Sequence, residues 1–190
     1  MTTFTDDVGD DLAGFFAKCA ADGSPCVIDV DKLVGFADKA IQTAQLCNDL
    51  VLRDSAMLES LAGLQSIESV LGDLMLLDNP VLRTLQGLDN LAHVGDDISI
   101  VGNARLESVA NLFGLSGDHL GDINIHANPT LMSLSGLDGL TAVGGNLHVT
   151  NCEALVNLAG IHNVTTVGGV RILRNHATTR PAVCCFVSCS

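Results

Sequence analysis

The sequence contains no tryptophan and no tyrosine, and aromatic residues make up only 3% of it, although 47% of its 190 residues are hydrophobic. The core must therefore be aliphatic. Leucine, valine and isoleucine at regular intervals suit a repeat architecture, in which every layer has the same cross-section. The length is sufficient for one domain with a sizeable core.

Basic residues are also scarce: nine Lys and Arg stand against 22 Asp and Glu, and the formal net charge is −13. Nucleic acids and anionic membrane surfaces attract clusters of Lys and Arg, so neither is an expected partner. Basic partners and divalent cations remain compatible with this charge. No segment approaches the roughly 18 consecutive apolar residues that a membrane-spanning helix needs, so no direct membrane insertion is expected.

A secretory leader is the third missing feature. The stretch "MTTFTDDVGDDLAG" is acidic and has neither a basic segment nor a continuous apolar one. Two interpretations stay open. The protein remains inside the cell, or this chain is a mature form or fragment of an exported protein.

A repeat of about 24 residues organises the chain from residue 49 to residue 175. Turns start at Asp49, Asp73, Asp97, Asp122 and Asn146, with a partial turn from Gly169. The consensus is D-L-x-L-x-x-N-P-x-L-x-S-L-x-G-L-x-x-L-x-x-V-G-G. Two apolar columns, two residues apart, are Leu50, Leu74, Ile98, Ile123, Leu147, Val170 and Leu52, Leu76, Ile100, Ile125, Val149, Ile172.

The spacing of leucines within each turn predicts a solenoid. Leu-x-Leu has period two and indicates a short strand with two inward side chains. The later L-x-x-L-x-x-L spacing indicates short straight pieces joined by corners, where Gly63, Gly87, Gly136 and Gly160 supply unusual backbone angles. Each turn would advance by about 4.8 Å and insert aliphatic side chains worth roughly 1.5–3 kcal/mol each when fully buried.

One further column is polar and is expected to face inward at a corner. It reads Ser55, Asn79, Asn103, Asn128, Cys152 and Asn175. An asparagine amide has two donors and an acceptor, so it can bond both its own turn and the next. Stacked amides would then form an asparagine ladder. Cys152 would be a buried, unpaired substitute within it.

The two ends of a solenoid expose unpaired strand edges and apolar side chains, so each end needs a capping segment. Residues 1–48 are interpreted as an N-terminal α-helical cap, in which residues 31–46 form a helix over the first turn, with Asp31 as its N-cap. Residues 5–20 show a second helical pattern. Residues 49–175 are five full turns and a partial one, and residues 176–190 form a Cys-rich tail.

The runs G-D/N-L-x-I/L-x-x-N-P-x-L and L-x-G-L-x-x-L-x-x-V-G-G resemble the receptor L domain family across residues 26–175. This family supplies the ligand-binding lobes of receptors of the epidermal growth factor and insulin receptor type, and related repeats occur in fungal sporulation and cell-wall surface proteins. An ordinary leucine-rich repeat fits less well. It places one residue between its Asn and the next Leu, whereas Asn79-Pro80-Val81-Leu82 has two.

The resemblance implies a mainly β fold, a right-handed single-stranded β-helix with a helix over its N-terminal end. It also implies a disulfide between Cys26 and Cys47, which flank the proposed helix. In the family a cysteine-rich module often follows, and Cys184, Cys185 and Cys189 resemble its beginning.

Side chains that point outward from the strands predict an interaction face. Met75, Leu77 and Val101 would form an apolar patch, which either binds a partner or is covered by a cap, tail or neighbouring domain. The third turn carries one extra residue around 114–121, expected to bulge out as a loop and offer a second contact. The ligand-binding candidates are Met75, Leu77, Ser99, Val101, Asn124, His126, His148 and Arg171.

No catalytic set is recognisable. His126 and His148 lie on outward positions of neighbouring strands, where a metal pair and a solvated surface are both compatible. Asp96 and Asp97 fall where other turns carry Gly-Asp or Gly-Asn, so they are interpreted as corner residues. The V-G-G segments are corners rather than phosphate-binding loops. We therefore expect no enzyme, no cofactor and no resident metal.

The expected function is non-catalytic recognition of a protein or glycan through one solenoid face, outside the cell or at its surface, as part of a larger surface protein. A structural cell-wall repeat protein and a cytoplasmic leucine-rich-repeat-like scaffold stay open as alternatives. Asn163-Val164-Thr165 is a glycosylation sequon and adds slight support for secretion.

The seven cysteines give a test of compartment. In a secreted protein, Cys152 would stay free while the other six pair, whereas an intracellular protein would keep seven thiols or bind zinc at its C-terminus. We expect one alkylatable thiol after unfolding without reductant, counted by mass spectrometry. Six or seven would contradict the secreted interpretation.

Overall fold

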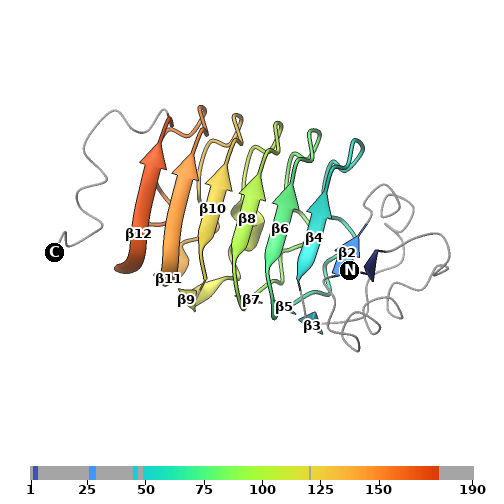
Figure 1. Ribbon diagram of the computed structural model, residues 1–190, viewed down its shortest axis with the longest axis horizontal. Helices are drawn as coiled ribbons and strands as arrows, with labels where there is room; N and C mark the ends of the chain where they lie inside the picture. Colours follow the sequence, from blue (N-terminus) through green and yellow to red (C-terminus); the bar gives the residue numbers. More distant parts are fainter. Residues whose placement is uncertain (1, 4–25, 29–44, 47–48, 120, 176–190) are drawn as a thin grey trace.

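The Leu-x-Leu segment of each repeat forms one strand of a large parallel sheet. In the computed structural model, which describes residues 2–3, 26–28, 45–46, 49–119 and 121–175, these strands lie side by side in chain order (Figure 1). The strands of the repeats are β4 (Leu50–Arg53), β6 (Leu74–Leu77), β8 (Ile98–Val101), β10 (Ile123–His126), β11 (Gly139–Thr150) and β12 (Thr166–Leu173). Two short strands that precede the repeats, β1 (Thr2–Thr3) and β2 (Cys26–Ile28), extend the same sheet. The chain is thus mainly β, a parallel β-solenoid of about five turns with about 24 residues per turn.

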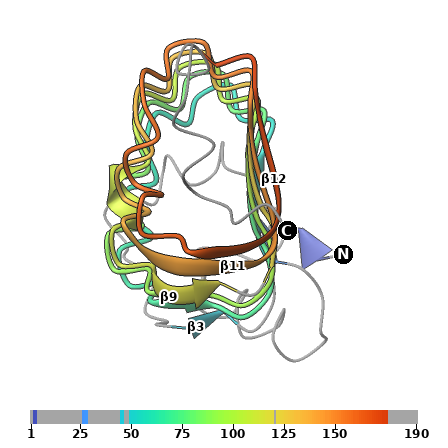
Figure 2. The ribbon, with the colours of Figure 1, turned by 90° about the vertical axis from the view of Figure 1, so that its left-hand side faces the viewer.

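A second strip of parallel pairing lies on another side of each turn. Strands β3 (Gln45–Leu46), β5 (Ser69–Val70) and β7 (His93–Val94) form a three-stranded sheet. The same side continues in β9 (Ser116–His119), which pairs with the first part of β11. Figure 2 looks along the solenoid and shows the turns stacked so that their outlines nearly coincide.

The interior is aliphatic, as the missing aromatics require. The inward residues of β4, β6, β8, β10 and the second part of β11 are at most 3% exposed. They form one continuous cluster with the leucines of the corners. The last turn is less covered, and Ile172 is only partly buried. The turns between the first and the last therefore bury their apolar side chains against two neighbours, which is how a solenoid gains stability.

The chain turns sharply where each strand of the large sheet ends. The residue after the strand has a positive φ in every turn: it is Asp54, Asp78, Gly102, Ala127, Asn151 or Arg174. The next residue belongs to the asparagine ladder, whose members are buried. Asn79 and Asn103 show the bonding pattern. The Asn103 Oδ1 accepts from the Asn79 backbone N–H at 3.2 Å, and its Nδ2 donates to the Leu76 carbonyl at 2.9 Å.

Cys152 occupies this ladder with a thiol in place of an amide. Its side chain is buried and forms no disulfide. The Sγ donates weakly to the carbonyls of Ile125 and Thr150 at 3.9 and 3.6 Å, and it takes hydrogen bonds from Asn128. Burial raises the pKa of the Cys152 thiol, which the bonds from Asn128 only partly oppose. The Cys152 thiol is therefore protonated and inaccessible to solvent. It packs in the interior and does not act as a nucleophile.

Glycine is required at the opposite corner. Gly63, Gly87, Gly136 and Gly160 have φ between 104° and 117°, as the sequence predicted. A Cβ on Gly87 would overlap the Leu61 carbonyl of the preceding turn. The third turn has Asn111 at this place, and there the chain instead forms a short 3₁₀ helix, η3 (Ala110–Leu112).

The structure changes the prediction for the N-terminal segment. The proposed helices over residues 5–20 and 31–46 lie outside the described residues except at Gln45–Leu46, which form strand β3. The prediction that the helix extends to residue 46 is wrong, because these two residues pair in parallel with Ser69 and Val70. Strand β2 also pairs with β4 at the 24-residue offset, within the segment assigned to the cap.

The predicted loop of the third turn is wrong as well. Ser116–His119 form strand β9, which pairs with β11 across a register shift between Leu140 and Ala142. The shift leaves one residue of β11, Thr141, without a partner in β9, so the pairing between these two turns is irregular. The described residues contain no helix long and apolar enough to cross a membrane.

The ladder predicts the effect of substitutions at Cys152. Cys152→Asn should raise the free energy of unfolding by about 1 kcal/mol, because an amide makes stronger hydrogen bonds than a thiol in this slot. Cys152→Val should lower it by about 1–3 kcal/mol by leaving the Asn128 N–H without an acceptor. Urea unfolding measures both.

Asn103→Cys provides the converse control, since it replaces an amide with a thiol two positions away in the same ladder. It should lose stability. An Asn at residue 152 that destabilises as much as Val would contradict the ladder interpretation.

Candidate functional site

Three adjacent strands place a grid of polar side chains on the outer face of the large sheet. In register, Asn124 of β10 lies beside His148 of β11 and then Arg171 of β12. The second row consists of His126, Thr150 and Leu173. Parallel pairing without a register break in these segments fixes the alignment, because the outward residues alternate with the buried ones.

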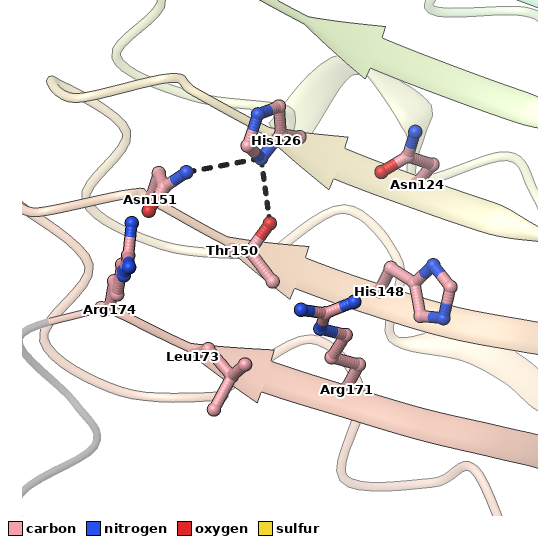
Figure 3. Close-up of a pocket in the computed structure, with 8 residues that line it drawn as sticks. All are labelled: Asn124, His126, His148, Thr150, Asn151, Arg171, Leu173 and Arg174. Carbon is pink, nitrogen blue, oxygen red and sulfur yellow. Dashed lines mark hydrogen bonds between the residues drawn. The ribbon is translucent and has the colours of Figure 1, made fainter.

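A third row comes from the positive-φ corner that follows each strand. It consists of Ala127, Asn151 and Arg174. Eight of these nine side chains, all except Ala127, line a hollow of about 350 Å³ (Figure 3). The short Thr150 side chain lies at the centre of the grid, and longer side chains surround it. The hollow thus results from differences in side-chain length on a regular backbone.

Hydrogen bonds hold the imidazole of His126 in place. Its Nδ1 lies 2.7 Å from the Thr150 hydroxyl and 3.4 Å from the Asn151 Nδ2 (Figure 3). An amide NH₂ can only donate, so Nδ1 is assigned as the acceptor. In this tautomer Nε2 carries the proton and remains able to donate to a ligand.

The charge of the hollow is opposite to that of the protein. Arg171 and Arg174 line it, and no carboxylate does. Within the described part of the chain, no carboxylate forms an ion pair with either guanidinium, whereas Arg83 lies 3.3 Å from Glu107 and Arg53 lies 3.8 Å from Asp54.

Carboxylates are also sparse in this part of the sequence. Residues 49–121 contain 11 Asp and Glu, but residues 122–175 contain only three. Two arginines and two histidines therefore face solvent in the least acidic part of the solenoid.

The sequence candidates divide into two groups on this one face. Asn124, His126, His148 and Arg171 line the hollow. Met75, Leu77, Ser99 and Val101 lie half-buried on β6 and β8. Met75, Leu77 and Val101 form the apolar end of the face, and Ser99 lies between Met75 and Asn124 of the hollow. His126 and His148 are diagonal neighbours, but no group of three or more His, Cys, Asp or Glu suited to a metal occurs among the described residues.

Four lining residues were not among the candidates: Thr150, Asn151, Leu173 and Arg174. Asn151 and Arg174 belong to the corner column immediately before the asparagine ladder. The sequence contains one signal for this part of the site: residue 174 is an arginine, whereas the same position in earlier turns is Asp, Gly, Ala or Asn.

The remaining candidates occupy separate places. Asn163 is exposed and its Nδ2 donates to the Asp138 carbonyl at 2.8 Å. Cys26 begins strand β2, and Cys47 lies outside the described residues, so the proposed disulfide cannot be placed.

A row of acidic side chains lines the other end of the strands. Each carboxylate accepts from the backbone N–H of the next turn: the Asp73 Oδ1 accepts from Asp97 at 2.8 Å, and the Asp97 Oδ1 accepts from Asp122 at 2.7 Å. Burial raises the pKa of Asp73, as do the nearby charges of Asp49, Asp97 and Asp96, against the bond from the Asp97 N–H. These bonds give the row a structural role.

No protein-family model, curated protein or solved structure matches the chain. The resemblance to receptor L domains therefore depends on the repeat residues themselves, and the chemistry of the site must be argued from its own geometry.

The raised pKa of Asp73 predicts a stabilising substitution. A raised carboxyl pKa means that the ionised form is disfavoured in the folded state, so stability is lost as pH rises from the unfolded pKa through the folded one. Asp73→Asn should remove this loss while keeping an oxygen acceptor. We expect a gain of about 0.5 kcal/mol at pH 7, after allowing for solvent screening of a partly exposed group.

Thermal unfolding at pH 7 and pH 3 would measure this effect, which should shrink at pH 3, where the carboxyl is protonated. Asp73→Ala is the matched control, since it removes charge and acceptor together and should be less stable than Asp73→Asn. Equal stability of the two variants would contradict the role of the Asp97 hydrogen bond.

Proposed function

We propose that this chain is a non-catalytic recognition domain that binds a protein or glycan ligand through the outer face of its large sheet. It would act outside the cell or at its surface, as part of a larger surface protein. In this proposal it is a right-handed β-helix of the receptor L domain type, with a helix over its N-terminal end. The observation that carries the proposal is the face itself, on which an apolar end adjoins a cationic, polar hollow.

The rigidity of the face supports a binding role. Its strands are joined in register from β4 to β12, and the asparagine ladder fixes where each strand ends. A backbone fixed in this way loses little conformational entropy on binding, which favours affinity. The half-buried Met75, Leu77 and Val101 add apolar area without exposing a large patch.

The backbone around Thr150 supports a non-catalytic role. The pair of Thr150 and His126 has the spacing of a nucleophile and a base. Acyl transfer would also need N–H donors aimed at the reacting oxygen. The adjacent Asn151 N–H instead donates to the Leu173 carbonyl at 3.0 Å, within the sheet. The Thr150–His126 bond is thus best explained as a support for the imidazole.

Substitutions on the face test the proposal. Wild-type protein would be screened against a glycan array and a library of secreted proteins, and each ligand found would be titrated. Leu77→Asp places a charge in the apolar end, and Ser99→Arg places a long side chain between this end and the hollow. We expect at least one of them to weaken the ligand's binding more than tenfold.

Val156→Asp is the matched control, because Val156 is 61% exposed and lies outside the large sheet. It should leave binding unchanged. A ligand whose binding survives both face variants but is lost in the control would overturn the proposal.

A further inference from the structure

We propose that the hollow around Thr150 binds an acidic sugar of the uronic acid type, whose carboxylate is held by Arg171 and Arg174. This inference rests on the proposed function, since it names the ligand class for one part of the same face. It is carried by three properties of the hollow: its charge, its hydrogen-bonding groups and its lack of an apolar anchor.

The positive charge of the hollow favours a ligand with an anionic group. Arg171 and Arg174 are both exposed, and neither forms an ion pair with a carboxylate in the described part of the structure. Guanidinium groups bind carboxylates through two parallel N–H bonds, a geometry that lysine does not offer. Arg171 lies within β12 and Arg174 directly follows this strand, so the two arginines line the same edge of the hollow on either side of Leu173.

The remaining lining favours a ligand rich in hydroxyl groups. Asn124 and Asn151 provide amide donors and acceptors, the Thr150 hydroxyl oxygen accepts while its hydrogen is donated to His126, and the Nε2 of His126 donates in the assigned tautomer. A sugar ring presents alternating hydroxyl donors and acceptors that match such a set. The volume of about 350 Å³ is at the small end of the range for ligand pockets and accommodates one sugar unit.

The shortage of apolar lining argues against an acidic peptide. Peptide and protein ligands usually bury an aromatic or aliphatic anchor at the centre of their contact, whereas Leu173 is the one apolar residue that lines this hollow. No Phe, Trp or Tyr lines it. The free energy of binding would thus come from charge and hydrogen bonds, and it should fall as salt is added.

The test is a titration of the full chain with trigalacturonate, followed by isothermal calorimetry at low and physiological salt. The neutral comparison is the same trisaccharide with its carboxylates converted to methyl esters. We expect trigalacturonate to bind at least tenfold more tightly than the ester. Arg171→Gln and Arg174→Gln should each reduce its affinity at least tenfold, while Arg→Lys at either position should recover only part of the loss.

Arg105→Gln is the control for general electrostatics, because Arg105 is exposed and belongs to an earlier turn. It should retain wild-type affinity. Unchanged thermal unfolding of the Arg171 and Arg174 variants would show that they fold.

Three results would overturn the inference. They are equal affinity for the acid and its ester, affinity that survives both Gln substitutions, and tighter binding of a triglutamate peptide or a sulfated trisaccharide. In each case the proposed function would stand if Leu77→Asp or Ser99→Arg abolished the binding of another ligand. The two proposals therefore fail separately.

Discussion

The hydrogen bond from the backbone N–H of a ladder residue to the ladder side chain of the next turn is the constraint on which the structure depends; the acceptor is an Asn Oδ1 for Ser55, Asn79, Asn103 and Cys152, and the Cys152 thiol for Asn128. The chain reverses direction there through a positive-φ residue, and such a corner leaves backbone groups without sheet partners. The amides satisfy them in the interior, where Asn79, Asn103 and Asn128 are fully buried. Without these bonds, each corner would bury unpaired polar groups at a cost of about 1–3 kcal/mol apiece.

Side-chain hydrogen bonds join neighbouring turns at both ends of the strands, and they run in opposite directions along the solenoid. At the ladder, the side chain of the following turn accepts from the preceding backbone, as Asn79 does from Ser55. At the acidic row, the side chain of the preceding turn accepts from the following backbone, as Asp49 does from Asp73. These two sets of bonds fix the position of each turn relative to the next one at both ends of every strand. This alignment brings residues 124, 148 and 171 into one row.

The repeat made most of the fold predictable. A period of 24 residues with inward Leu-x-Leu pairs identifies the buried columns, and the solenoid of parallel strands follows from it. The two-residue strand β3 was not predictable, because its pairing with Ser69 and Val70 comes from the stacking of whole turns rather than from local propensity. The loop expected around residues 114–121 was wrong for the same reason, since strand β9 (Ser116–His119) pairs with β11 of the next turn.

Most of the candidate site was predictable. Strand alternation places six of the eight lining residues on the outer face: Asn124, His126, His148, Thr150, Arg171 and Leu173. Four of these, Asn124, His126, His148 and Arg171, were binding candidates. Asn151 and Arg174 required knowledge of the corner, where a positive φ directs the side chain after the strand toward the same face. The hollow itself depends on Thr150 being shorter than its neighbours, and no periodicity contains that information.

The uneven distribution of carboxylates along the stacked turns has a further consequence. Because turns succeed one another along a single axis, 11 acidic residues in positions 49–121 and three in positions 122–175 give the solenoid an electric dipole along its length. Such a field orients the molecule during encounter and concentrates anions near its less negative end. A strongly acidic protein can in this way present one end to a negatively charged surface and keep the other away from it.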